Sequence, residues 1–113
     1  MQEQHLASVI GSGSLKVLGT PALIGFMEKT AHVLAQTHLD NSLSSVGIAI
    51  EAKHLKPSLK GAKIMIKAFL IKKTEKILTF HLEAYDNQIL VGTAEHERAI
   101  INVEKFKNKM GLV

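Results

Sequence analysis

The sequence predicts an α+β fold in which one long apolar helix is wrapped by a curved antiparallel β-sheet, with a short helix at the C-terminal end. Two observations predict it. A segment with helical periodicity comes first, and segments with alternating apolar residues, joined by short turns, follow it. This order is typical of the α+β class. No repeat, linker or low-complexity run divides the 113 residues, so we expect 1–113 to form a single domain.

The long helix is predicted between about Pro21 and His38. Thr20 can cap its unpaired N–H groups, Pro21 suits its first turn, and the polar residues 40–42 end it. Residues 22–27 are apolar nearly all round the predicted helix. We therefore expect this half of the helix to be covered on most sides by the rest of the chain.

Strands are predicted after the helix, because the spacing of apolar residues changes from helical to every second residue. In the first strand, His54 continues the inward face and Gly47 lies on the opposite face. The residues expected to point inward are Val46, Ile48, Ile50 and Ala52 in the first strand, Ala62, Ile64, Ile66, Ala68 and Leu70 in the second, and Leu78, Phe80, Leu82 and Ala84 in the third.

The last three strands are expected to form an antiparallel meander, because short polar turns at 73–75 and 86–88 join them. The final strand runs from Ile89 to about Val103, and Asn102 caps a short helix over 104–110. A single sheet of this kind leaves unpaired edges. We therefore expect the chain to associate with itself, with a dimer and a tetramer both left open.

The charge balance argues against a nucleic-acid partner. Fourteen basic residues exceed ten acidic ones for a formal net charge of +4, but Arg98 is the only arginine and aromatic residues make up 4%. Proteins that read nucleic acids rely on arginine forks and aromatic stacking. Residues 56–76 hold seven lysines and one glutamate, which is either a solvated face or an attraction for a phosphorylated ligand.

Several other classes are excluded by what the sequence lacks. The absence of cysteine excludes a disulfide scaffold, thiolate-bound zinc and a cysteine nucleophile. The histidines do not have the spacing of metal ligands, so we expect no metal. There is no apolar stretch of about 18 residues and no basic-then-apolar leader, which predicts a cytoplasmic protein without membrane contact.

Glu28 and His54 are the first two candidates for chemistry. Glu28 follows the apolar half of the helix, where a desolvated carboxylate can act as a base or nucleophile. The residues alone favour the plainer interpretation, a solvated carboxylate paired with Lys29 or His32. His54 lies at the rim of the predicted core, where it is either a structural histidine with one nitrogen in solvent or a general acid.

Thr20 and Arg98 are the other two candidates. Thr20 is an N-cap by position, and a hydroxyl at a helix N-terminus also lies near a natural oxyanion site. Arg98 is either a charge on an edge strand that pairs with an acid, or a residue whose position requires the planar geometry of a guanidinium.

These candidates lie within short motifs that follow one another in a fixed order. The motifs are Val-Leu-Gly-Thr-Pro-Ala-Leu at 17–23, Met27-Glu28, Ser45-Val46-Gly47, Lys-His-Leu-Lys-Pro at 53–57, and His96-Glu97-Arg98. In this order and at this spacing, the sequence from about Gly13 to Phe106 resembles the fluoroacetyl-CoA thioesterase family of hotdog-fold proteins. The resemblance implies a hotdog fold and a homodimer with its active site near the subunit interface.

The resemblance also implies roles for individual residues. It places Thr20, Glu28 and His54 in the catalytic set, makes Arg98 a functional arginine, and sets Gly47 against the acyl group of the substrate. It therefore favours the catalytic interpretation of Glu28. The implied activity is hydrolysis of a short or medium acyl-CoA thioester, with coenzyme A as part of the substrate and no cofactor.

Two alternatives stay open, since fold alone does not separate them from a thioesterase. One is a hotdog hydratase or dehydratase acting on acyl thioesters, and the other is a non-catalytic acyl-CoA-binding module. The sequence also departs from the family in one segment. Residues 11–15 hold no aromatic residue where the fluoroacetyl-specific enzyme has gating phenylalanines, which predicts a more open acyl pocket. With about ten residues before Gly11, we expect the first strand of the fold to be short or missing.

Overall fold

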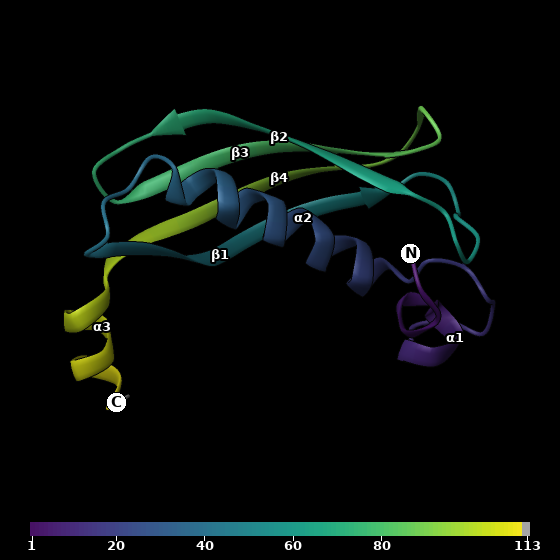
Figure 1. The fold of residues 1–113 in the computed structure, drawn as a ribbon, viewed down its shortest axis with the longest axis horizontal. Coiled ribbons are helices and arrows are strands. Elements are labelled where there is room, and N and C mark those ends of the chain that lie inside the picture. Colours follow the sequence, from purple (N-terminus) through teal and green to yellow (C-terminus); the bar gives the residue numbers. More distant parts are fainter. Residues whose placement is uncertain (112–113) are drawn as a thin grey trace.

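Four antiparallel strands form one sheet that curves along a long helix. The structure, a computed structural model, describes residues 1–111. Its elements in chain order are η1 (Glu3–His5), α1 (Ala7–Ile10), α2 (Thr20–Gln36), β1 (Leu43–His54), β2 (Ile64–Lys73), β3 (Ile77–Asp86), β4 (Ile89–Asn102) and α3 (Val103–Met110). The strand order is β1-β4-β3-β2, so β2, β3 and β4 form the expected meander and β1 joins β4. The predicted fold is confirmed, with α2 along the sheet and α1 and α3 at its opposite ends (Figure 1).

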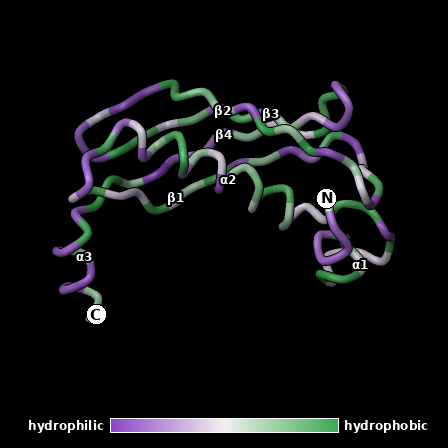
Figure 2. Tube along the Cα trace, viewed as in Figure 1, coloured by the Kyte–Doolittle hydropathy of each residue, from purple (hydrophilic) through white to green (hydrophobic). Residues whose placement is uncertain are grey.

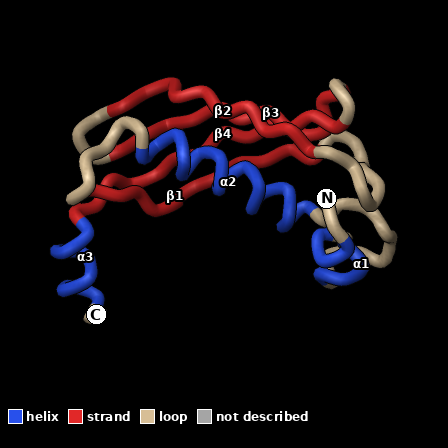
Figure 3. The backbone as a smooth tube through the Cα atoms, in the orientation of Figure 1, coloured by secondary structure: helices blue, strands red, loops and turns tan. Residues whose placement is uncertain are grey.

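Helix α2 packs on the sheet through one stripe of residues spaced by four. Leu23, Met27, Ala31 and Ala35 are fully buried, and the two alanines are small enough to let the helix lie close to the strands. The expectation that the first half is covered on most sides is only partly right. Gly25 lies on the solvent side, because the sheet covers the helix from one direction only (Figure 3).

The core lies between α2 and the two central strands. The inward residues predicted for β3 are all fully buried against the helix side of the sheet, and β4 adds buried residues beside them. Hydrophobic and hydrophilic residues alternate along the strands (Figure 2). The inward residues of β2 are half-buried, because β2 is an edge strand with a neighbour on one side only. The residues of this core on the strands are Leu78, Phe80, Leu82, Ala84, Val91 and Ala94.

Strand β1 contains a bulge at Ile48 that reverses its alternation. Pairing with β4 steps from Gly47–Arg98 to Ala49–Glu97, which leaves Ile48 without a partner. Ser45 is therefore buried at 5% exposure, while Ile48 is 52% exposed. The prediction that Val46 and Ile48 point inward and Gly47 points outward is wrong, because regular alternation does not allow for the extra residue at Ile48.

Both chain ends carry short helices. Asn102 caps α3 as predicted, its side-chain oxygen accepting a hydrogen bond from the Lys105 backbone N–H at 3.1 Å. Before α2, a bridge between Leu6 and Leu18 joins the two short helices η1 and α1 to the segment that leads into α2. A second bridge, between Val17 and Leu59, joins that segment to the loop before β2. No helix within residues 1–111 is long and apolar enough to cross a membrane.

Candidate active site

Thr20 and His54 meet where helix α2 begins and strand β1 ends. Thr20 Oγ1 lies 2.9 Å from His54 Nδ1, within hydrogen-bonding distance. The expected capping role of Thr20 is wrong, because the helix starts one residue earlier than predicted. Gly19 is the N-cap, and because glycine has no side chain, no side chain caps the helix. The Thr20 hydroxyl is thus turned toward His54 instead of toward the helix backbone.

The other nitrogen of His54 has no protein partner. Its Nε2 atom is buried, yet makes no hydrogen bond with any of the residues 1–111. Burial lowers the pKa of His54 from its ordinary value, and a backbone hydrogen bond at Lys56 partly opposes this change. The imidazole is therefore neutral at neutral pH. A pocket of about 300 Å³ opens beside the pair, lined also by Leu18, Leu55 and Pro57 among others.

Glu28 lies further along the same helix, against the inner side of β1. Glu28 lies eight positions after Thr20, and eight positions correspond to a rise of about 12 Å along a helix axis. The side chain is half-buried, and Glu28 Oε2 is 2.9 Å from the point where a Cβ at Gly47 would lie. The missing side chain of Gly47 therefore makes room for the carboxylate. The bulge at Ile48 is what turns Gly47 toward the helix.

Arg98 is buried on the inner face of β4, at 6% exposure. Its Nε donates to Ser45 Oγ at 2.8 Å and its Nη2 donates to the Ser45 carbonyl oxygen at 3.1 Å. Its Nη1 lies 3.5 Å from the same Cβ point at Gly47 that Glu28 approaches. Burial lowers the pKa of the Arg98 guanidinium from its ordinary value, while the nearby Glu28 carboxylate acts in the opposite direction.

His96 was not singled out from the sequence, although it belongs to the same buried cluster. It is 1% exposed, with Nδ1 2.8 Å from the Ala49 carbonyl oxygen and Nε2 3.2 Å from Arg98 Nη1. One signal could have found it. His96 lies in phase with Ala94 and Arg98, so once one of these positions points inward, all three do.

The five residues expected in the site form two groups. Thr20 and His54 form one, and Glu28, Gly47 and Arg98 form the other. Within residues 1–111, the Glu28 side chain makes no hydrogen bond or salt bridge, so no direct contact joins the groups within one chain.

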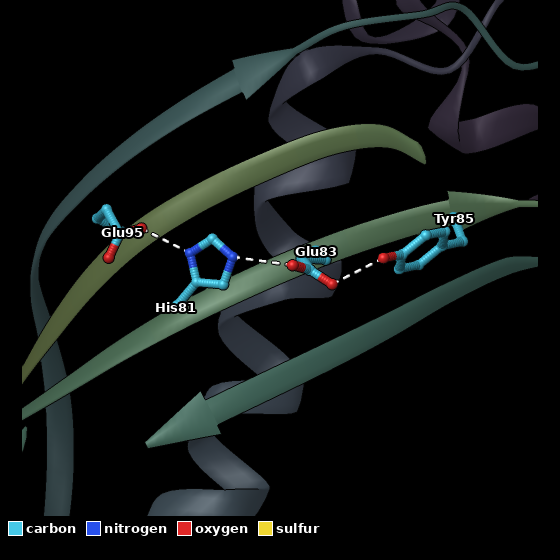
Figure 4. A network of polar contacts seen from close by, with 4 residues as sticks. All are labelled: His81, Glu83, Tyr85 and Glu95. Atoms are coloured by element: carbon cyan, nitrogen blue, oxygen red, sulfur yellow. Dashed lines mark hydrogen bonds and ion pairs between the residues drawn. The ribbon is translucent and has the colours of Figure 1, made fainter. Parts of the chain in front are cut away.

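A separate polar network lies on the outer face of the sheet (Figure 4). His81 Nδ1 is 2.6 Å from Glu95 Oε1, His81 Nε2 is 3.1 Å from Glu83 Oε2, and the Tyr85 hydroxyl donates to Glu83 Oε1 at 2.7 Å. The hydrogen bonds to Glu95 and then Glu83 raise the pKa of His81 from its ordinary value. Nowhere in residues 1–111 do three metal-binding side chains gather in a suitable arrangement, this network included.

The antiparallel sheet wrapped along α2 defines the class of hotdog-fold proteins. Comparison with known families then identifies the group within it. Residues 1–104 match the model of the fluoroacetyl-CoA-specific thioesterase family, and the chain belongs to that family. The expected class of activity is thereby confirmed, and the protein is a thioester hydrolase.

Individual relatives agree with this assignment. The fluoroacetyl-CoA thioesterase of Streptantibioticus cattleyicolor is 28% identical over 95 residues, which cover 84% of this chain and 68% of that protein. A solved structure of the fluoroacetyl-CoA thioesterase FlK superposes with a TM-score of 0.87 at 23% identity, covering 97% of this chain and 86% of that one. A thioesterase superfamily member from Thermus thermophilus superposes with a TM-score of 0.88 at 20% identity, covering 97% and 82%. At these identities the structures establish the fold.

Proposed function

We propose that the protein hydrolyses a short or medium acyl-CoA to the free acid and coenzyme A. The observation that carries this proposal is the hydrogen bond between Thr20 and His54. It pairs two residues expected in the catalytic set at the N-terminus of α2, beside a pocket, with the buried His54 Nε2 left for a water molecule or the departing sulfur. Water is the second reactant, and the residues proposed here act on it without a resident cofactor or metal.

Glu28 is the group proposed to start the reaction. Its carboxylate either attacks the acyl carbonyl or takes a proton from the attacking water, and the half-buried setting favours both roles. In the first case the C–S bond breaks to leave a Glu28 anhydride, which water then hydrolyses, and in the second case it breaks directly to give the acid. His54, neutral at rest, orients the water through Nε2, or takes a proton from it and passes that proton to the departing thiolate. A thiol of ordinary pKa near ~8.5 leaves readily, so this step needs less acid assistance than cleavage of an amide.

The helix N-terminus is proposed to bind the oxygen that becomes negative during the attack. The Thr20 hydroxyl and the nearby backbone N–H groups of α2 supply donors, and the helix dipole adds a positive field. At the other group, Gly47 faces the acyl chain and Arg98 supplies positive charge near Glu28. The lysines of residues 56–76 are available to the phosphates of coenzyme A, and we propose that the reaction takes place in the cytoplasm.

The site is proposed to be completed by a second copy of the chain. The long edge strand β1 has one unpaired side, and its Ile48 side chain is 52% exposed. A two-fold axis near Glu51, halfway between the bulge and the C-terminal end of β1, pairs these edges antiparallel and brings the His54 end of one β1 to the bulge of the other. Glu28 of one subunit then faces Thr20 and His54 of its partner, which accounts for their separation within one chain.

The acyl group is proposed to be less restricted than fluoroacetyl. The relative from Streptantibioticus cattleyicolor is named a fluoroacetyl-CoA thioesterase. In this chain, the pocket beside Thr20 and His54 is lined by aliphatic and polar residues from the segment 7–18 and from 54–57, without an aromatic side chain. We expect acetyl-CoA and fluoroacetyl-CoA to be hydrolysed with similar kcat/KM, within about tenfold of each other.

Release of free thiol from a panel of acyl-CoAs tests the activity and its residues. We expect Glu28→Gln and His54→Ala to fold normally by circular dichroism and to lose at least about 100-fold in kcat. Full activity in both folded variants would overturn the assignment. Hydration of an unsaturated acyl-CoA without thiol release would favour the hydratase alternative, and tight binding without turnover would favour the binding module.

Mixing two inactive variants tests the shared site. When Glu28→Ala and His54→Ala subunits are co-refolded, half of the dimers are mixed, and each mixed dimer holds one complete site if the two residues act across the interface. About a quarter of the wild-type activity per chain should return. If each site lies within one subunit, mixing restores nothing. A stable monomer in light scattering would also contradict the proposal.

A further inference from the structure

The buried Arg98 is held entirely by neutral acceptors. Its three hydrogen-bond partners are Ser45 Oγ, the Ser45 carbonyl oxygen and His96 Nε2. Buried charges in proteins are ordinarily paired with an opposite charge, because desolvation of a lone ion is costly. No carboxylate lies within salt-bridge distance of Arg98 among residues 1–111. Its positive charge is therefore fixed in place without being cancelled.

The hydrogen bonds of His96 assign its tautomer. The Ala49 carbonyl oxygen can only accept, so His96 Nδ1 carries the proton and donates to it. The Arg98 guanidinium can only donate, so His96 Nε2 is the unprotonated acceptor. Ala49 is the first paired residue after the bulge, which means that His96 links the bulge of β1 to the guanidinium.

We propose that His96 is a positioning residue, which holds Arg98 Nη1 at Gly47 and keeps the positive charge of the arginine available to Glu28 and the reacting acyl group. This inference rests on the proposed function of Glu28. It is supported by geometry, since Glu28 Oε2, Arg98 Nη1 and His96 Cε1 all lie within 3.5 Å of the Cβ point at Gly47. A neutral acceptor suits this task, because a carboxylate at position 96 would cancel the charge it holds.

Three substitutions at position 96 separate this role from simple packing. In His96→Gln, the amide nitrogen can donate to Ala49 while the amide oxygen accepts from Arg98, so both contacts survive. His96→Leu fills much of the space but removes both contacts. His96→Glu keeps an acceptor for Arg98 and adds the cancelling charge. His38→Gln, on an exposed residue after α2, is the matched control.

The experiment measures kcat and KM for thiol release, with the midpoint of thermal unfolding recorded for every variant. We expect His96→Gln to stay within about threefold of wild type in kcat, and His96→Leu and His96→Glu to lose about 10- to 100-fold with KM little changed. The control should match wild type. Rescue by glutamine separates a hydrogen-bonding role from a requirement for an imidazole ring.

A double-mutant cycle with Arg98→Met identifies the residue through which His96 acts. If His96 works through Arg98, adding His96→Leu to Arg98→Met should lower kcat by less than about threefold further. Multiplied losses in the double variant, or full activity of folded His96→Leu, would overturn the inference. A Glu28→Gln variant that retains full activity would instead overturn the proposed function, so the two failures are distinguishable.

Discussion

A single methyl group at Gly47 should separate activity from stability in this protein. In Gly47→Ala, the new Cβ would lie 2.9 Å from Glu28 Oε2, 3.3 Å from His96 Cε1 and 3.5 Å from Arg98 Nη1. Favourable contacts between heavy atoms begin near ~3.5 Å, so the carboxylate oxygen must retreat by about 0.5 Å or more. The end of a glutamate side chain moves easily, whereas the buried imidazole has little room to do so.

The cost of Gly47→Ala should therefore appear in catalysis. We expect kcat to fall about 30-fold, which corresponds to about 2 kcal/mol of transition-state stabilisation. Stability should change by less than about 1 kcal/mol, since alanine is favoured over glycine in a strand and offsets part of the crowding. Gly25→Ala is the matched control, because a Cβ at Gly25 meets no other atom within 4 Å.

Thiol release and thermal unfolding of both glycine variants decide the outcome. Gly25→Ala should keep wild-type activity and gain up to about 1 kcal/mol of stability, as expected for alanine in a helix. If Gly47→Ala retains full activity, Glu28 does not need the position it occupies against β1. If its activity falls only as far as its folded fraction does, the loss is structural, and the reasoning is refuted as well.

The charged and titratable side chains give three further predictions. Arg98→Lys should lower kcat at least about tenfold and destabilise the fold by about 1–3 kcal/mol, because a single ammonium cannot reach the three buried acceptors that the planar guanidinium fork contacts. The control Lys109→Ala should change neither thiol release nor unfolding. In NMR titrations, the pKa of His54 should lie below 6.5 and the pKa of His81 above it; reversed shifts would contradict the burial and the carboxylate contacts described. The folded-state pKa of His81 is raised, so the contribution of His81 to stability is fully present below about pH 6.5 and is lost as the pH rises through the raised value. His81→Gln should therefore lower the unfolding midpoint near pH 6 and not near pH 9. The contribution of this solvent-screened network should be small and should weaken in salt, and an effect independent of pH would exclude the ion pairs as its source.

Much of the fold follows from residue spacing alone. Leu78, Phe80, Leu82 and Ala84 alternate without interruption, and all four are fully buried in β3. The cap at Asn102 was also predictable, because its chemistry depends on one side chain and the backbone three residues later. Local rules succeed where the structure is regular.

The site could be predicted only in part, because its geometry depends on irregular backbone. An extra residue at Ile48 turns Gly47 inward, and no hydrophobic pattern reveals that shift. The start of α2 at Thr20 sends the hydroxyl to His54, a partner 34 positions away that capping rules do not consider. The resemblance between motifs could name these residues, but their contacts come from tertiary structure.

The bulge in β1 also constrains how the chain can change in length. Exposed loop tips and chain ends ordinarily tolerate the loss of one residue, whereas in a strand such a loss shifts the register. Deleting Ile48 would restore regular pairing with β4 and turn the preceding half of the strand over, so that Ser45 and Gly47 would face solvent. The buried arginine would then lose two of its three acceptors through a change that removes only a half-exposed side chain. Variants designed by transferring β1 between related proteins should therefore keep the residue count between Ser45 and Ile50 fixed.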